Sequence, residues 1–268
     1  MSTTPSDNLG DDLGDDLGEP LGHDPGDDRV PRLVFLHVPK TGGTTMMRVL
    51  EAAYPGRTHY IQNGAWTEQR ERLAALGVRL HRALVFMGHT PYGIHEVIPY
   101  PCRSIVVLRH PGDRIVSLYH HILREPKHHL HERVAGRGMS LEDFGTSAIT
   151  AAVDNYQTRM LAGGEPGFSH PPGRCPEALL EIATANLCRP ENLVGTQDRL
   201  AKFIRALRRE LGWSSAPRYE SLRVTPDRSP FKKLDPGVRA ALEQANALDM
   251  RLYEKARSVA LGARVRVF

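Results

Sequence analysis

The sequence has few cysteines and lacks any long apolar segment. Its three cysteines, Cys102, Cys175 and Cys188, are odd in number and form no close CxxC pair. This pattern argues against a disulfide framework and favours free thiols in a reducing compartment. The longest apolar runs, such as residues 104–108, have the length of a strand, and the amino terminus lacks the apolar core of a signal peptide. We therefore expect a cytoplasmic protein without a transmembrane segment.

Basic residues are missing from the first 28 positions, which hold nine of the 31 acidic residues. This stretch repeats a Leu-Gly-Asp-Asp unit at residues 9–12 and 13–16, and it is too acidic and glycine-rich to bury a core. We predict a disordered tail over residues 1–30, with a polyanion mimic or a calcium-binding repeat as alternatives, and one folded domain over residues 31–268. The rest of the chain carries 35 basic residues against 22 acidic ones, a formal charge of +13, which favours an anionic partner.

Short apolar runs alternate with helical patterns along the first half of the chain. The runs predict buried strands at residues 32–38, 84–88, 103–109 and 192–196. Helices are predicted at residues 44–54, from Pro111 onward, and at 140–146, 149–161, 176–187, 197–211 and 236–261. The order predicts an α/β fold with a central parallel sheet flanked by helices, in the layout of P-loop kinases. Ligands of such sheets bind at the carboxyl ends of the strands.

A phosphate-binding loop is predicted where the first strand meets its helix, at Lys40-Thr41-Gly42-Gly43-Thr44-Thr45. Backbone amides, hydroxyls and the positive end of the helix can converge there on an anion. The lysine precedes the glycines, whereas the Walker A loop ends in Gly-Lys-Ser/Thr, so a standard ATP or GTP loop is disfavoured. A tight turn carrying a surface lysine is the alternative.

The run from Phe35 to Thr45 resembles the 5′-phosphosulfate loop of sulfotransferases that use 3′-phosphoadenosine-5′-phosphosulfate (PAPS), especially the family that includes heparan sulfate 2-O-sulfotransferase. The resemblance implies that Lys40 contacts the 5′-phosphate and the bridging oxygen of the breaking S–O bond. It also implies that Thr41, Gly42, Gly43, Thr44 and Thr45 supply backbone and hydroxyl contacts to PAPS. Residues 31–268 would then form the sulfotransferase domain.

A second anion site is predicted at Arg109 and Ser117. Arg109 closes a strand and Ser117 lies eight residues later in the next helix, so both side chains can reach one phosphate. Residues 108–119 resemble the 3′-phosphate segment of the same family, which reads Leu-Arg-Asp-Pro, then Arg, then Ser-x-Tyr. The resemblance implies that Arg109 and Ser117 bind the 3′-phosphate of PAPS. His110 stands where that segment has aspartate.

Sulfuryl transfer needs an in-line hydroxyl nucleophile, a base for its proton and positive charge at the departing phosphate oxygen, and it requires no metal. His89 follows the predicted strand 84–88, in a segment that resembles the Gly-His segment carrying the base of heparan sulfate 2-O-sulfotransferase. An imidazole suits this role because its ordinary pKa is about 6.5. We predict that His89 is the base. His37 is the rival, although strand alternation favours a packing role for it.

The resemblance spans roughly residues 32–256 and leaves three questions open. Asn155 and Arg159 share one helix face, where they could edge the ligand site or form a buried polar network. The family's Asn-x-Thr pattern is altered around Thr225, so contacts of Thr225 or Arg228 with the nucleotide stay open. Five histidines between residues 120 and 131 could bind a metal, rim an anionic acceptor or form a solvated surface.

Together these residues predict a PAPS-dependent O-sulfotransferase. Its acceptor would be a hydroxyl of a carbohydrate, lipid-linked or small-molecule compound, including an anionic one, and neither a metal nor a nucleic acid is expected. A small-molecule kinase is an alternative, although it would need a carboxylate for Mg²⁺ and a Walker lysine. A non-catalytic polyanion-binding protein is the alternative outside enzymes. The oligomeric state is left open.

Overall fold

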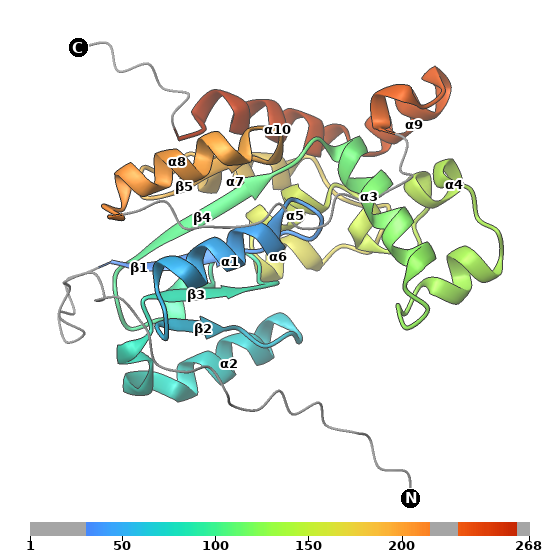
Figure 1. The fold of residues 1–268 in the computed structure, drawn as a ribbon. Helices are drawn as coiled ribbons and strands as arrows, with labels where there is room; N and C mark the ends of the chain where they lie inside the picture. The colour runs from blue at the N-terminus through green and yellow to red at the C-terminus, as the bar shows by residue number, and fades with distance from the viewer. Residues whose placement is uncertain (1–30, 215–229, 262–268) are drawn as a thin grey trace, which may run out of the picture.

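The computed structural model describes residues 31–214 and 230–261, in which five parallel strands form one sheet (Figure 1). Their order is β2 (Thr58–Tyr60), β3 (Val85–Gly88), β1 (Arg32–Leu36), β4 (Cys102–Leu108) and β5 (Leu193–Thr196). The predicted α/β fold with a central parallel sheet flanked by helices is confirmed. The acidic tail, Thr225 and Arg228 lie outside the described residues.

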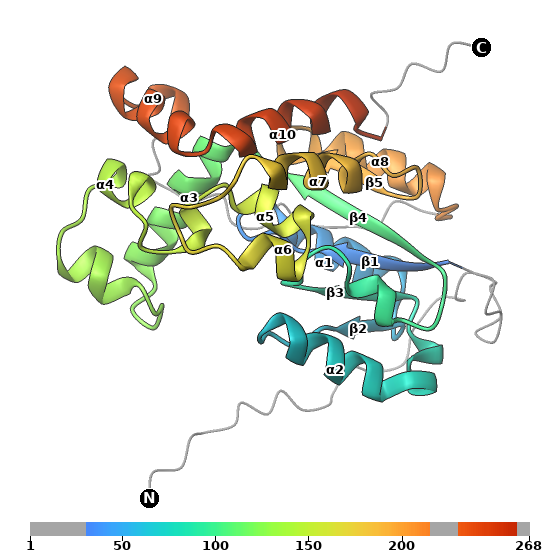
Figure 2. The ribbon, with the colours of Figure 1, turned by 180° about the vertical axis from the view of Figure 1, so that it is seen from behind.

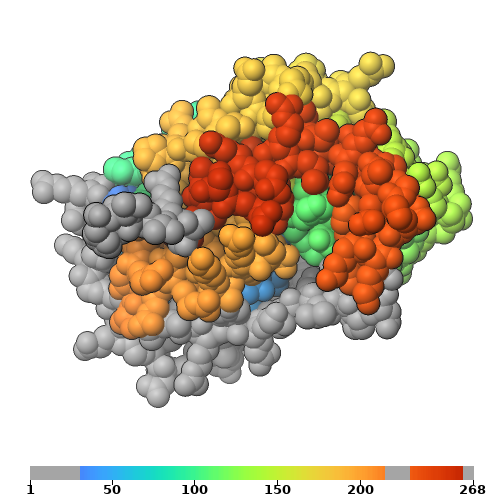
Figure 3. Space-filling model, turned by 90° about the horizontal axis from the view of Figure 1, so that it is seen from above, coloured from blue at the N-terminus to red at the C-terminus, as the bar shows by residue number. Residues whose placement is uncertain are grey.

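Helices cover both faces of the sheet, which explains why β1 is apolar throughout instead of alternating. Val34 and Leu36 face α5 (Tyr156–Ala162), α7 (Ala178–Leu187) and α10 (Ala247–Val259). Leu33 and Phe35 face α1 (Gly43–Ala53) and α8 (Leu200–Glu210). The two views of the ribbon show these helices on opposite sides of the sheet, and from above α10 lies between α7 and α8 (Figures 1, 2 and 3).

A helical region extends the sheet beyond the carboxyl ends of its strands. It consists of α3 (Pro111–Arg124), α4 (Leu141–Thr146) and α9 (Pro236–Ala245), which lie together at one end of the molecule (Figure 2). Their buried side chains include Ile115, Phe144 and Leu242. The remaining elements are α2 (Trp66–Leu76), α6 (Gly164–Phe168) and short turns at residues 77–82, 94–97, 132–136, 151–153, 197–199 and 231–233. Across the described residues, no helix has the length and apolar character needed to cross a membrane.

Several predicted boundaries were wrong for identifiable reasons. The sequence did not indicate β2, which has three residues at the sheet edge, or α2, which buries only Gln69 and Leu73. The predicted helix 149–161 is a short turn followed by α5, because Asn155 adopts a left-handed conformation with φ +48°. The predicted helix 236–261 breaks at Asn246 into α9 and α10.

The amino ends of α5 and α10 cap each other. Asp249 of α10 is fully buried, and its carboxylate accepts hydrogen bonds from the backbone amides of Gln157 and Thr158, at 3.1 and 2.7 Å. In return, the side-chain oxygen of Asn155 accepts from the amides of Leu248 and Asp249, at 2.9 and 3.1 Å. Each helix therefore satisfies amides at the amino end of the other.

Arg159 belongs to the same buried network. Its guanidinium has no exposed surface, forms an ion pair with Asp154, and donates to the backbone carbonyls of Gly167, His170 and Pro171. Neither Asn155 nor Arg159 lines the cavity described below. The geometry thus favours the buried-network interpretation of these two residues over a place at the ligand edge.

We expect Asp249→Ala to lower the free energy of unfolding by about 3–5 kcal/mol, because it removes the acceptor of several buried hydrogen bonds and the negative charge near a buried guanidinium. The substitution strands the amides of α5 and removes the carboxylate that supports the buried Arg114 guanidinium. Urea unfolding followed by circular dichroism measures the effect. The control is Glu254→Ala on the same helix, which loses only an exposed pair with Arg257 and should cost less than about 1 kcal/mol. Equal losses in the two variants contradict the capping role.

Candidate functional site

The predicted site residues meet at the carboxyl edge of the sheet. The loop after β1 leads into α1, His89 follows β3, and Arg109 follows β4 and precedes α3. One cavity of about 1040 Å³ lies among these segments. It is lined by all but one of the predicted residues, namely Lys40, Gly42, Gly43, Thr44, Thr45, His89, Arg109 and Ser117.

The exception is Thr41, which is fully buried inside the loop. Its hydroxyl donates to the backbone carbonyl of Val38 at 2.8 Å, so the side chain braces the loop instead of facing the cavity. The Thr41 hydroxyl is thus engaged within the loop, and a contact of Thr41 with PAPS stays a prediction. The buried Thr41 side chain thus holds the turn between β1 and α1 in place.

Glycine is required at Gly42 and at Gly43 for two different physical reasons. Gly42 has φ +94°, a left-handed conformation in which a side chain is strained. Gly43 is required by close approach, because a Cβ atom there would lie 1.7 Å from Nε2 of His37. Lys40 also has a positive φ, +70°, so the loop turns sharply on both sides of Thr41. The loop then delivers its backbone to the amino end of α1, where anions bind favourably.

His89 is exposed and held in one tautomer. Its Nδ1 atom lies 2.9 Å from the backbone carbonyl oxygen of His37. A carbonyl oxygen only accepts hydrogen bonds, so Nδ1 carries the proton of the neutral ring and Nε2 keeps its lone pair. The ring stacks on His37, with 4.2 Å between the centroids. This arrangement leaves Nε2 of His89 able to accept a proton.

His37 has the environment of a packing residue. Its ring is stacked between His89 and Phe35, 5.6 Å from the latter. Burial lowers the pKa of His37 to about 3, and His89 and Lys40 add to this effect. An imidazole with so low a pKa is a weak base, and its place in the stack agrees with the packing role expected from strand alternation.

Two glutamines that sequence reasoning did not single out hold the backbone of the site. Gln69 of α2 donates to the backbone carbonyls of His89 and Gly64, at 3.1 and 3.3 Å. Gln157 of α5 accepts from the amide of Arg109 and donates to the carbonyl of the same residue, both at 2.9 Å. The sequence signal for Gln157 was its place between Asn155 and Arg159, in an Asn-x-Gln-x-Arg run.

Arg109 crosses from β4 to the loop after β1. Its Nη1 atom donates to the backbone carbonyl of Lys40 at 3.0 Å, while Gln157 fixes both backbone polar groups of the arginine. Arg114 also lines the cavity, with its guanidinium over the ring of Tyr156 at 5.5 Å and a 2.6 Å hydrogen bond to the carbonyl of Ala152. The predicted phosphate sites are thus joined by direct contacts.

The cavity contains further polar side chains that have no predicted role. Asp198 lies just after β5 and accepts a hydrogen bond from the Tyr253 hydroxyl at 3.0 Å. Desolvation opposes its ionisation, but hydrogen bonds from Thr196 and Tyr253 hold the pKa of Asp198 below its usual range. His121, His128 and His129, three of the five clustered histidines, also line the cavity. Within the described residues, no group of three or more histidine, cysteine, aspartate or glutamate side chains is arranged to hold a metal.

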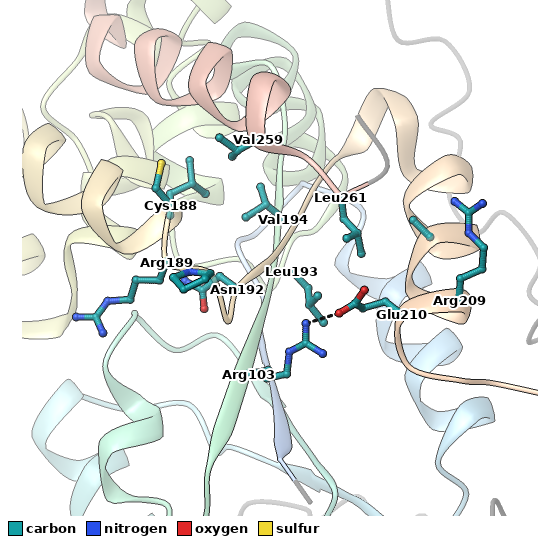
Figure 4. Close-up of a pocket in the computed structure, with 13 residues that line it drawn as sticks. Arg103, Cys188, Arg189, Asn192, Leu193, Val194, Arg209, Glu210, Val259 and Leu261 are labelled. Atoms are coloured by element: carbon teal, nitrogen blue, oxygen red, sulfur yellow. Dashed lines mark hydrogen bonds and ion pairs between the residues drawn. The ribbon is translucent and has the colours of Figure 1, made fainter. Parts of the chain in front are cut away.

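A second pocket, of about 750 Å³, lies at the amino end of β4 and beside β5 (Figure 4). Its wall combines apolar side chains such as Leu193, Val194 and Val259 with an ion pair between Arg103 and Glu210 at 2.8 Å. None of the predicted site residues lines it. Because parallel sheets bind ligands at their carboxyl ends, this pocket is on the wrong edge for the predicted chemistry.

A family model described as "Sulfotransferase family" matches residues 27–256, most of the chain and nearly the span of the resemblance found in the sequence. The chain belongs to the sulfotransferase family. Membership makes this sulfotransferase a transferase and supports sulfuryl transfer as its general activity. A comparison with curated proteins finds none that matches the chain.

Gly43→Ala should destabilise this sulfotransferase by about 1–3 kcal/mol, because the added methyl group overlaps the ring of His37 and the loop must move. In the double variant Gly43→Ala/His37→Ala the obstacle is gone, so the cost of the alanine at position 43 should shrink. Urea unfolding of the four proteins in this cycle measures the coupling. A cost of Gly43→Ala that is the same with and without His37 contradicts the close-approach explanation.

Proposed function

We propose that this protein transfers the sulfuryl group of PAPS to a hydroxyl of its acceptor and releases adenosine 3′,5′-bisphosphate. One observation carries the proposal: the loop of Lys40, the Arg109–Ser117 pair and His89 line the same cavity at the carboxyl edge of the sheet. Family membership supports the reaction type, and the cavity supports the assignment of residues.

The cofactor half of the cavity suits a ligand with two separated anionic groups. Lys40 and the amides at the amino end of α1 would hold the 5′-phosphosulfate, and Arg109 with Ser117 would hold the 3′-phosphate. The contact of Arg109 with the carbonyl of Lys40 keeps the two binding elements in register. When bound, PAPS supplies an activated sulfuryl group whose leaving group is a phosphate oxygen.

His89 and Lys40 have different roles in the proposed reaction. His89 accepts the proton of the acceptor hydroxyl at Nε2, the atom left free by the hydrogen bond of Nδ1 to the His37 carbonyl. The hydroxyl oxygen forms its bond to sulfur as the bond from sulfur to the phosphate oxygen breaks. Lys40 places its positive charge beside the charge that develops on that phosphate oxygen.

A small-molecule kinase is the second candidate function. The observation in its favour is the position of Asp198 in the cavity. Its ionised carboxylate lines the cavity and could contact Mg²⁺. The lysine that precedes the glycines, in place of the Walker order, argues against this candidate.

Calorimetry should therefore show tighter binding of adenosine 3′,5′-bisphosphate than of ADP with Mg²⁺. We expect Arg109→Ala to weaken bisphosphate binding by about 10- to 100-fold, because a charged hydrogen bond to the 3′-phosphate is lost. The variant should lose much less affinity for adenosine 5′-monophosphate, which lacks that phosphate and is affected only through the contact of Arg109 with the Lys40 carbonyl. Preference for ADP with Mg²⁺ would support the kinase, and binding of no nucleotide would support the polyanion-binding protein.

His89→Ala should lower kcat by about 10²- to 10⁴-fold without weakening bisphosphate binding, the usual effect of losing a general base. His37→Gln is the matched control and should retain most of the activity, since the low pKa of His37 makes it a weak base. A reversed order of the two variants contradicts the assignment of His89.

A further inference from the structure

Three histidines form a wall of the reaction cavity that the proposed function does not use. This histidine wall consists of His121 on α3 and of His128 and His129 in the segment after it. The rings of His128 and His129 stack with centroids 4.5 Å apart, and His121 meets His128 edge to face at 5.7 Å. Leu118 and Leu130 line the same cavity, so imidazole rings and apolar side chains both contribute to its surface here.

The wall lies close to the reacting end of the cavity. Burial lowers the pKa of both His121 and His128, and the positive charge of Lys40 lowers the pKa of each of them further. Lys40 is therefore within Coulombic range of both rings. His129 is exposed, and His121 and His128 are half-buried, so a molecule in the cavity can reach them.

The neutral wall has a defined hydrogen-bonding character. Nδ1 of His128 accepts from the backbone amide of Leu130 at 3.1 Å, so the neutral ring carries its proton on Nε2. His131 lies behind the wall, with its Nδ1 2.7 Å from the carbonyl of Ile122, which ties the segment to α3. The wall can thus offer hydrogen-bond donors, acceptors and flat ring faces.

We propose that the histidine wall binds the sulfuryl acceptor and selects an uncharged hydroxyl compound over an anionic one. The inference rests on the proposed function, because it takes Lys40 and His89 as the landmarks of the reaction. The acceptor would lie between the wall and His89, with its hydroxyl towards Nε2 of His89.

The selection follows from the charges around the rings. The groups that act on His121 and His128 from the surrounding elements are Lys40, Arg124, Glu125, His129 and His131, together with each other. An anionic acceptor gains most from a wall that is protonated, but burial and Lys40 disfavour that form at neutral pH. Binding an anion is therefore coupled to proton uptake, whereas a hydroxyl compound binds the neutral wall directly.

Two matched probes test the charge selection, p-nitrophenyl β-glucoside and p-nitrophenyl β-glucuronide, which differ by a carboxylate on the same ring. At pH 7.5 we expect kcat/KM for the glucoside to exceed that for the glucuronide by about tenfold or more, with transfer measured as release of adenosine 3′,5′-bisphosphate. A pH low enough to protonate His121 and His128 should shift the preference towards the glucuronide, and because burial lowers the pKa of both rings this pH lies below the ordinary histidine range. A preference for the glucuronide at pH 7.5 overturns the selection.

Variants of the wall test its place in acceptor binding. His128→Ala and His121→Ala should raise KM for the glucoside about 5- to 30-fold, the range expected for a lost hydrogen bond, with little change in KM for PAPS. Both should also remove the pH-dependent shift in preference. His120→Ala is the control, since His120 neighbours the wall on α3 but does not line the cavity.

The outcomes distinguish a failure of the proposed function from a failure of the inference about the histidine wall. Failure of the wild type to bind adenosine 3′,5′-bisphosphate would refute the proposed function itself. Bisphosphate binding without transfer to the glucoside would overturn the inference alone. Wall variants that weaken bisphosphate binding as much as they raise KM for the glucoside would assign the wall to the nucleotide, and that result also overturns the inference.

Discussion

The buried carboxylate of Asp249 is the constraint on which the rest of the site depends. It fixes the amino end of α5 by accepting the amides of Gln157 and Thr158. The side chain of Gln157 then reaches both backbone polar groups of Arg109, and the guanidinium of Arg109 reaches the carbonyl of Lys40. A continuous path of hydrogen bonds thus runs from α10, near the end of the chain, to the loop after the first strand.

This path explains why a helix far from the predicted chemistry matters for it. A carboxylate buried without partners is strongly unfavourable, so Asp249 must keep its amide donors, and that requirement holds α5 in one position. An arginine side chain has many conformations in solution, and fixing its backbone from one side and its guanidinium from the other removes most of them. The energy that folds the helical half therefore also preorganises an anion site.

Two groups of residues that line the cavity differ in how their charge is controlled. The side with Lys40 and Arg109 carries permanent positive charge, which suits phosphate and sulfate groups. For His121 and His128, burial lowers the pKa and the positive charge of Lys40 adds to this effect. The same lysine can thus attract an anionic group of one substrate and disfavour protonation of two other residues of the cavity.

How much the sequence could predict depended on the range of the interactions. The loop Lys40–Thr45 and the segment from Arg109 to Ser117 were predictable because each is a local turn from strand to helix with a recognisable pattern. The roles of Gln69, Gln157 and Asp249 were not, because their partners lie 20, 48 and 91 or 92 residues away. The hydrogen bond of the Thr41 hydroxyl to the carbonyl of Val38 was also not indicated by the sequence, because only the folded loop brings the two groups together.

His110 stands where the 3′-phosphate segment of the family has aspartate, and its contacts also come from distant parts of the sequence. Its ring contacts Phe231 and Tyr253 with centroids 5.0 and 5.8 Å apart, and the Tyr253 hydroxyl donates to Asp198 at the end of β5. The residue after Arg109 therefore packs into an aromatic contact that connects the ends of β4 and β5. Because Gln157 already satisfies the amide and the carbonyl of Arg109, no carboxylate is needed at position 110 to hold that arginine. A change at a residue next to the anion site is tolerable when the backbone of the site is secured from another helix.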